Sequence, residues 1–87
     1  MQITIEEQGD RCAIIAANNA TTTTFPLSIT GDALRHGLRT ILAASEIKDY
    51  TIPDGPSLVR QPDGITVVTV AGRFAIPYTH ALPLVLA

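Results

Sequence analysis

Charge, cysteine and tryptophan are all scarce in this sequence. Only 16% of its 87 residues are charged, whereas ordinary globular domains are about one-quarter charged. Cys12 is the only cysteine, so no intrachain disulfide can form, which excludes disulfide-stapled secreted domains and multi-cysteine zinc folds. The length suits one small domain and is too short for two, so we expect residues 1–87 to form a single domain.

Long hydrophobic runs are absent as well, since none approaches the roughly 20 apolar residues that cross a bilayer. The segment Met1–Glu7 alternates apolar and polar residues and ends on two acids, where a signal peptide has a positive flank and an apolar core. We therefore expect a cytoplasmic protein without a membrane segment.

Neither sign of charge dominates. The net charge of −2 and the pI near 5.4 argue against a generic binder of polyanions, because such domains usually show a clear basic excess. The sequence has no Gly-rich Walker loop and no dinucleotide fingerprint. We expect no cofactor.

Alternating apolar residues predict β-strands in both halves of the chain. Residues 2–8 and 11–17 are typical of a hairpin that turns at Gly9-Asp10. A third strand follows around Phe25. Because proline has no amide donor, Pro26 predicts that this strand lies at a sheet edge or ends its pairing there. Residues 58–60, 65–70 and 73–77 predict a second β-meander. The prolines and the glycine in the connector 46–56 predict an irregular segment between the halves.

One amphipathic helix is predicted from Gly31 to Ser45. Thr30 is its expected N-cap, and Asp32 in the first turn favours the positive end of the helix dipole. Gly37 in the interior indicates close approach to another element. The tail 78–87 is apolar on nearly every side and fits either a short helix or an extended arm.

These elements predict an α+β fold. We expect an antiparallel sheet of five or six strands, built from two β-meanders, with the amphipathic helix and the apolar C-terminal helix or arm on one face. A weak similarity between the two halves is compatible with a repeated β-β-β-α order, but short strand-to-helix junctions look alike by physical necessity, so chance similarity is the preferred explanation.

The sequence contains no arrangement typical of catalysis or metal binding. Asp32 and His36 lie one helical turn apart, but the possible nucleophiles Cys12, Ser28 and Thr30 are not placed near them by any local spacing. A metal site on His36, His80 and one carboxylate is also unsupported by spacing. We therefore expect no catalytic, cofactor-binding or metal-ligating residues.

The feature that stands out is the uncharged tail Ala81–Ala87, which is more apolar surface than one small domain readily covers. We expect the tail either to dock in the groove of a partner subunit or to lie across the protein's own sheet as part of a larger shared core. The first alternative predicts self-association, most simply as a homodimer, through Leu82, Leu84, Val85 and Leu86. The polar helix face of Arg35, His36 and Arg39 is the expected contact for another partner.

The sequence therefore predicts a small, non-enzymatic protein-interaction module of the accessory, adaptor or inhibitor type, such as phages and mobile elements carry. One alternative is a nucleic-acid-binding accessory protein that uses the ridge of Arg35, His36 and Arg39 on phosphates. A small-ligand-binding protein or an enzyme is the third hypothesis, and it would need a pocket near Cys12, His36 or His80.

Overall fold

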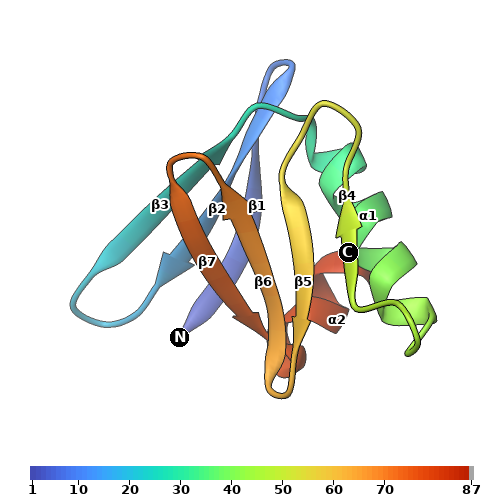
Figure 1. Cartoon of the computed structure of the whole chain (residues 1–87). Coiled ribbons are helices and arrows are strands. Elements are labelled where there is room, and N and C mark those ends of the chain that lie inside the picture. The colour runs from blue at the N-terminus through green and yellow to red at the C-terminus, as the bar shows by residue number, and fades with distance from the viewer. Residues whose placement is uncertain (87) are drawn as a thin grey trace.

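The computed structural model describes residues 1–86, and Ala87, the last residue of the predicted tail, lies outside the described residues. It is an α+β domain in which antiparallel sheets and two helices surround a shared core (Figure 1). In chain order the elements are β1 (Gln2–Gln8), β2 (Arg11–Ala17), β3 (Thr22–Leu27), α1 (Gly31–Ala43), β4 (Asp49–Thr51), β5 (Ser57–Gln61), β6 (Gly64–Thr69), β7 (Gly72–Pro77) and α2 (Tyr78–Leu86).

The strands form two sheets, so the prediction of a single sheet of five or six strands is corrected. One sheet has the order β1-β2-β3 and the other β4-β5-β6-β7. Pro26 pairs with Ala13 on the edge strand β3, as its missing amide donor predicted. The sheets meet through side chains at this edge, where the rings of Phe25 on β3 and Phe74 on β7 lie 5.6 Å apart.

The connector between the halves was predicted to be irregular, but it contains the short strand β4. A tight turn makes this pairing possible, because the Gly55 amide donates to the Ile52 carbonyl at 2.8 Å and the Ile52 amide donates to the Pro56 carbonyl at 3.0 Å. Asp54 takes a positive φ of 59° in this turn. The second half consequently has four strands before its helix, and the suggested β-β-β-α repeat is not exact.

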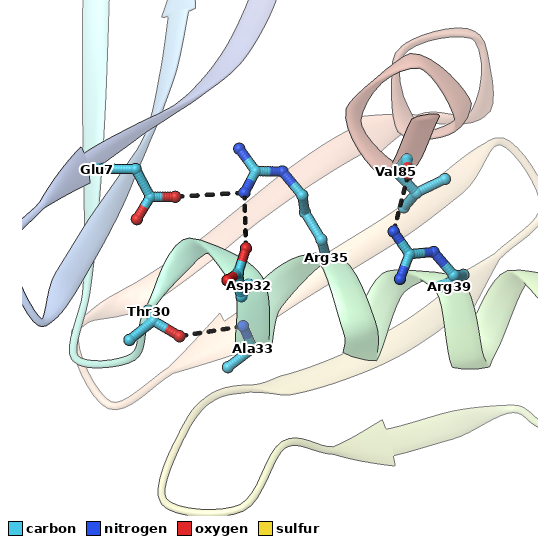
Figure 2. A network of polar contacts seen from close by, with 7 residues as sticks. All are labelled: Glu7, Thr30, Asp32, Ala33, Arg35, Arg39 and Val85. Carbon is cyan, nitrogen blue, oxygen red and sulfur yellow. Dashed lines mark hydrogen bonds and ion pairs between the residues drawn. The ribbon is translucent and has the colours of Figure 1, made fainter. Parts of the chain in front are cut away.

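Helix α1 begins where the sequence predicted and ends two residues earlier, at Ala43 rather than Ser45. The Thr30 hydroxyl accepts from the Ala33 amide at 3.1 Å, which confirms the predicted N-cap (Figure 2). The expected close approach at Gly37 is also confirmed, because a Cβ there would lie 2.8 Å from the side chain of Ile52.

The core lies where both sheets and both helices converge, and its members are apolar side chains from each of these elements. The fully buried ones include Ile14, Leu34, Leu38, Ile41, Leu58, Ile65, Val67 and Ile76. The tail is helical and lies against β1, β6 and β7, which places its inner face in this core. Neither described helix has the length and apolar content that a membrane span requires.

Candidate interaction surface

The two segments that the sequence singled out, the apolar tail and the basic ridge, lie side by side. Helix α2 packs against α1, and the Arg39 guanidinium donates to the Val85 carbonyl at 3.0 Å (Figure 2). This carbonyl belongs to the last turn of α2, where a positive charge is favourable. The segments that hold the predicted self-association and partner-binding residues are therefore adjacent, and we call the outer surface of α1 and α2 the helical layer.

Helix α2 divides the predicted self-association residues into two pairs. Leu84 and Val85 are 6% and 8% exposed and belong to the core, so their side chains offer no free surface. Leu82 and Leu86 are 53% and 82% exposed. Because they are one helical turn apart, they form a single exposed apolar stripe, with Pro83 exposed beside it. The predicted contact is thus reduced to Leu82 and Leu86.

Arg35 is held inside the protein's own polar network (Figure 2). Its guanidinium donates to the carboxylate of Glu7 at 3.3 Å and to that of Asp32 at 3.5 Å. Its side chain is only 22% exposed, and its Nε is buried without a hydrogen-bond partner among the described residues. Arg35 therefore joins α1 to β1 and presents little free charge to a partner.

His36 and Arg39 remain on the outer face of α1, together with Asp32. Thr40 donates its hydroxyl to the His36 carbonyl at 2.8 Å, so only the backbone of His36 is engaged in this bond. The Asp32 side chain is 98% exposed. The exposed stripe of α1 therefore carries a carboxylate near its first turn and a guanidinium farther along.

Sequence reasoning missed Arg60 on β5. Its Nη2 donates to the carbonyls of Ile41 and Ala44, at 3.0 Å in the second case, and its Nε donates to the Ile47 carbonyl at 2.9 Å. The carbonyls of Ile41 and Ala44 lie at the C-terminal end of α1, and that of Ile47 lies in the turn that follows. Helix α1 has no basic residue in its own last turn. An arginine that follows Leu58 and Val59 in a short strand was the signal that the sequence offered.

The side chains considered for catalysis or metal binding are not brought together. Cys12 is fully buried in β2, whereas His36 is exposed on α1. Burial raises the pKa of the Cys12 thiol, and the Glu7 carboxylate raises it further. No hydrogen bond in residues 1–86 joins Cys12, Ser28 or His80 to one another, and Thr30 is engaged as the helix cap. This part of the chain also contains no cluster of residues that could hold a metal ion.

Comparisons with known proteins add no assignment. No protein-family model matches the chain, and no match is found among curated proteins or solved structures. The functional argument therefore depends on the helical layer itself.

Proposed function

We propose that the protein is a non-enzymatic protein-interaction module that forms a reversible homodimer through its helical layer. The observation that carries this proposal is the exposed apolar stripe of Leu82 and Leu86, 53% and 82% exposed, on a helix with no charged residue in its first or last turn. Exposed apolar groups that gather on one face usually mark contact sites.

The charges beside the stripe support a second copy of the chain as the occupant. Asp32 and Arg39 lie on the exposed stripe of α1, two helical turns or about 10 Å apart. A twofold axis across this stripe would bring Asp32 of each copy toward Arg39 of the other, so the surface is complementary to itself. Arg39 donates to the Val85 carbonyl through Nη2 and keeps its other donors for this contact. A nucleic acid would instead meet the Asp32 carboxylate, which has the same sign of charge as its phosphates.

The energetics favour a reversible dimer over a permanent one. Burying a fully exposed leucine contributes about 1.5–3 kcal/mol, and the two copies together would bury four partly exposed leucines. Association costs at least about 4 kcal/mol in lost freedom of motion. The leucines therefore offset the cost of association, and the polar contacts of α1 set the remaining affinity.

The test is analytical ultracentrifugation of the full chain and of a variant carrying Leu82→Ser and Leu86→Ser. We expect the unmodified chain to dimerise in the micromolar to millimolar range, and the double variant to sediment as a monomer with an unchanged circular dichroism spectrum. Both substituted positions are exposed, so the fold should tolerate the change.

Val70→Ser is the matched control, because Val70 is a fully exposed aliphatic residue in the β6–β7 turn. This variant should dimerise like the unmodified chain. The proposal fails if the unmodified chain is monomeric up to about 1 mM, a dissociation free energy of about 4 kcal/mol. It also fails if the double variant dimerises with undiminished affinity.

A further inference from the structure

A cleft of about 710 Å³ lies at the end of the molecule where the loops gather. The β1–β2 turn, the end of β3, the β4–β5 loop and the β6–β7 turn surround it. Figure 1 shows these turns toward one end of the fold and α2 toward the other. Loops grouped on a rigid scaffold commonly carry binding residues, and this cleft is separate from the helical layer.

The lining of the cleft is mainly apolar. Pro26 and Leu27 of β3 face it from one sheet, and Pro56 and Val68 come from the other sheet and its loop. Val70, whose side chain is fully exposed, extends the apolar lining into solvent. Binding sites for small ligands and side chains typically combine about 300–1,000 Å³ of mostly apolar space with a few polar groups.

Arg11 is the only basic residue that lines this cleft. Arg35, Arg39 and Arg60 all donate to acceptors within the fold. Arg11, in contrast, makes no ion pair with any of the described residues. Its guanidinium therefore offers an unused charge beside an apolar floor, a combination that matches an acidic group next to an apolar one.

Asp54 is the only acidic residue of the lining, and it too has no ion pair within residues 1–86. It is held in the turn by a backbone with φ of 59°, a conformation that non-glycine residues adopt infrequently. The Asp54 carboxylate would repel a second acidic group of a ligand, and it can accept a hydrogen bond from a main-chain amide of the ligand. The ligand we infer thus has a single negative charge and free amide donors.

We propose that this cleft binds a short extended peptide segment in which an acidic side chain, held by Arg11, adjoins an apolar side chain seated on Pro26, Pro56 and Val68. A peptide suits the cleft better than a small molecule, because the cleft is open to solvent and its apolar lining continues outward to Val70. The lining hydroxyl of Ser28 can pair with a peptide group of the ligand, and that of Ser57, which already pairs with the Thr51 hydroxyl at 3.1 Å, keeps the capacity for one further bond. This proposal does not depend on dimerisation.

The test is an NMR titration of the ¹⁵N-labelled full chain with the blocked pentapeptide Gly-Leu-Glu-Leu-Gly. We expect saturable shifts at the amides of Ser28, Gly55, Ser57 and Ala71, all of which line the cleft. The same peptide with Gln in place of Glu should bind about threefold to fivefold more weakly, as should the Glu peptide to an Arg11→Gln variant. Arg73→Gln is the matched control, because this exposed arginine is outside the cleft lining, and it should leave binding unchanged.

Four results would overturn the proposal: no saturable shift, shifts confined to the helices, equal binding of the Glu and Gln peptides, or equal binding by N-acetyl-leucine amide, which would mark a small-molecule site. The variant with Leu82→Ser and Leu86→Ser separates the two proposals. It should bind the peptide like the unmodified chain, whatever its oligomeric state.

Discussion

The two helices contact the same core, but α1 presents a polar face to solvent and α2 presents an apolar one. Helix α1 exposes Asp32, His36 and Arg39, whereas α2 exposes Leu82 and Leu86. Each helix is tied at its C-terminal end by an arginine from another element, Arg60 for α1 and Arg39 for α2. The helices therefore differ in the chemistry of their exposed faces, whereas both are held at the C-terminal end by an arginine.

This difference indicates that low charge in a small domain has two separate causes. On the inner face of α1 and in the strands, apolar residues are buried in the protein's own core. On the outer face of α2 they are not, because no other described element covers Leu82 and Leu86. The outer face of α2 is therefore the surface for which we propose a partner.

Removing the α1 anchor should have the largest effect on stability. Arg60→Met keeps much of the aliphatic stem but removes the donors to the carbonyls of Ala44 and Ile47 and to that of Ile41. These bonds are partly buried, so we expect a loss of about 3 kcal/mol in the free energy of unfolding. Urea denaturation followed by circular dichroism measures it.

Arg39→Met is the matched comparison, because Arg39 makes one partly buried bond, to the carbonyl of Val85, where Arg60 makes three. We expect a loss of about 1 kcal/mol. Equal losses for the two variants would contradict the view that α1 depends more strongly on its arginine than α2 does.

Much of the fold was predictable because its signals are local. The first hairpin and the Thr30 cap depend on residues near one another in the sequence. The edge position of Pro26 and the close approach at Gly37 are indicated by the residue type at one position. The division into two sheets was not predictable, because each strand pairs only with its neighbours in chain order and no local pattern shows that strands of the two halves stay unpaired. Strand β4 was missed because a tight turn at Asp54 lets a segment rich in Pro and Gly pair with β5.

The sequence indicated which segments belong to the candidate site, but not which of their side chains are exposed. Leu82 and Leu84 look equivalent in the sequence, yet packing on the core buries one and exposes the other. The role of Arg35 depends on Glu7, which is 28 positions away. Contacts across such separations leave no local pattern, and the same holds for Arg60 and for the loop-end cleft.

A second test places alanine in the interior of α1. Gly37→Ala would improve helix propensity by about 1 kcal/mol at an exposed site. Here the new Cβ would lie 2.8 Å from Ile52 and 3.2 Å from Leu58, both of which are buried. We expect the crowding to dominate, with a net loss of about 1–2 kcal/mol. His36→Ala, at the neighbouring exposed position, is the control and should change the free energy of unfolding by about 0.5 kcal/mol or less. A stabilised Gly37→Ala variant would contradict the prediction and show that α1 can shift away from Ile52.

An alanine substitution inside α2 should have the opposite effect on the free energy of unfolding. Pro83 lies inside α2 on its exposed side, where it has no amide to donate to the Thr79 carbonyl one turn earlier. Pro83→Ala restores this donor without crowding the core, although it also gives the unfolded chain more freedom, which reduces the gain. We expect a net stabilisation of about 1 kcal/mol in thermal or urea unfolding. The comparison is best made in the variant with Leu82→Ser and Leu86→Ser, so that dimerisation does not contribute to the measured stability. If Pro83→Ala destabilises that monomer, the proline contributes to the packing of α2 against the sheets. The expectation that the outer face of α2 adds nothing to the stability of the monomer would then be wrong.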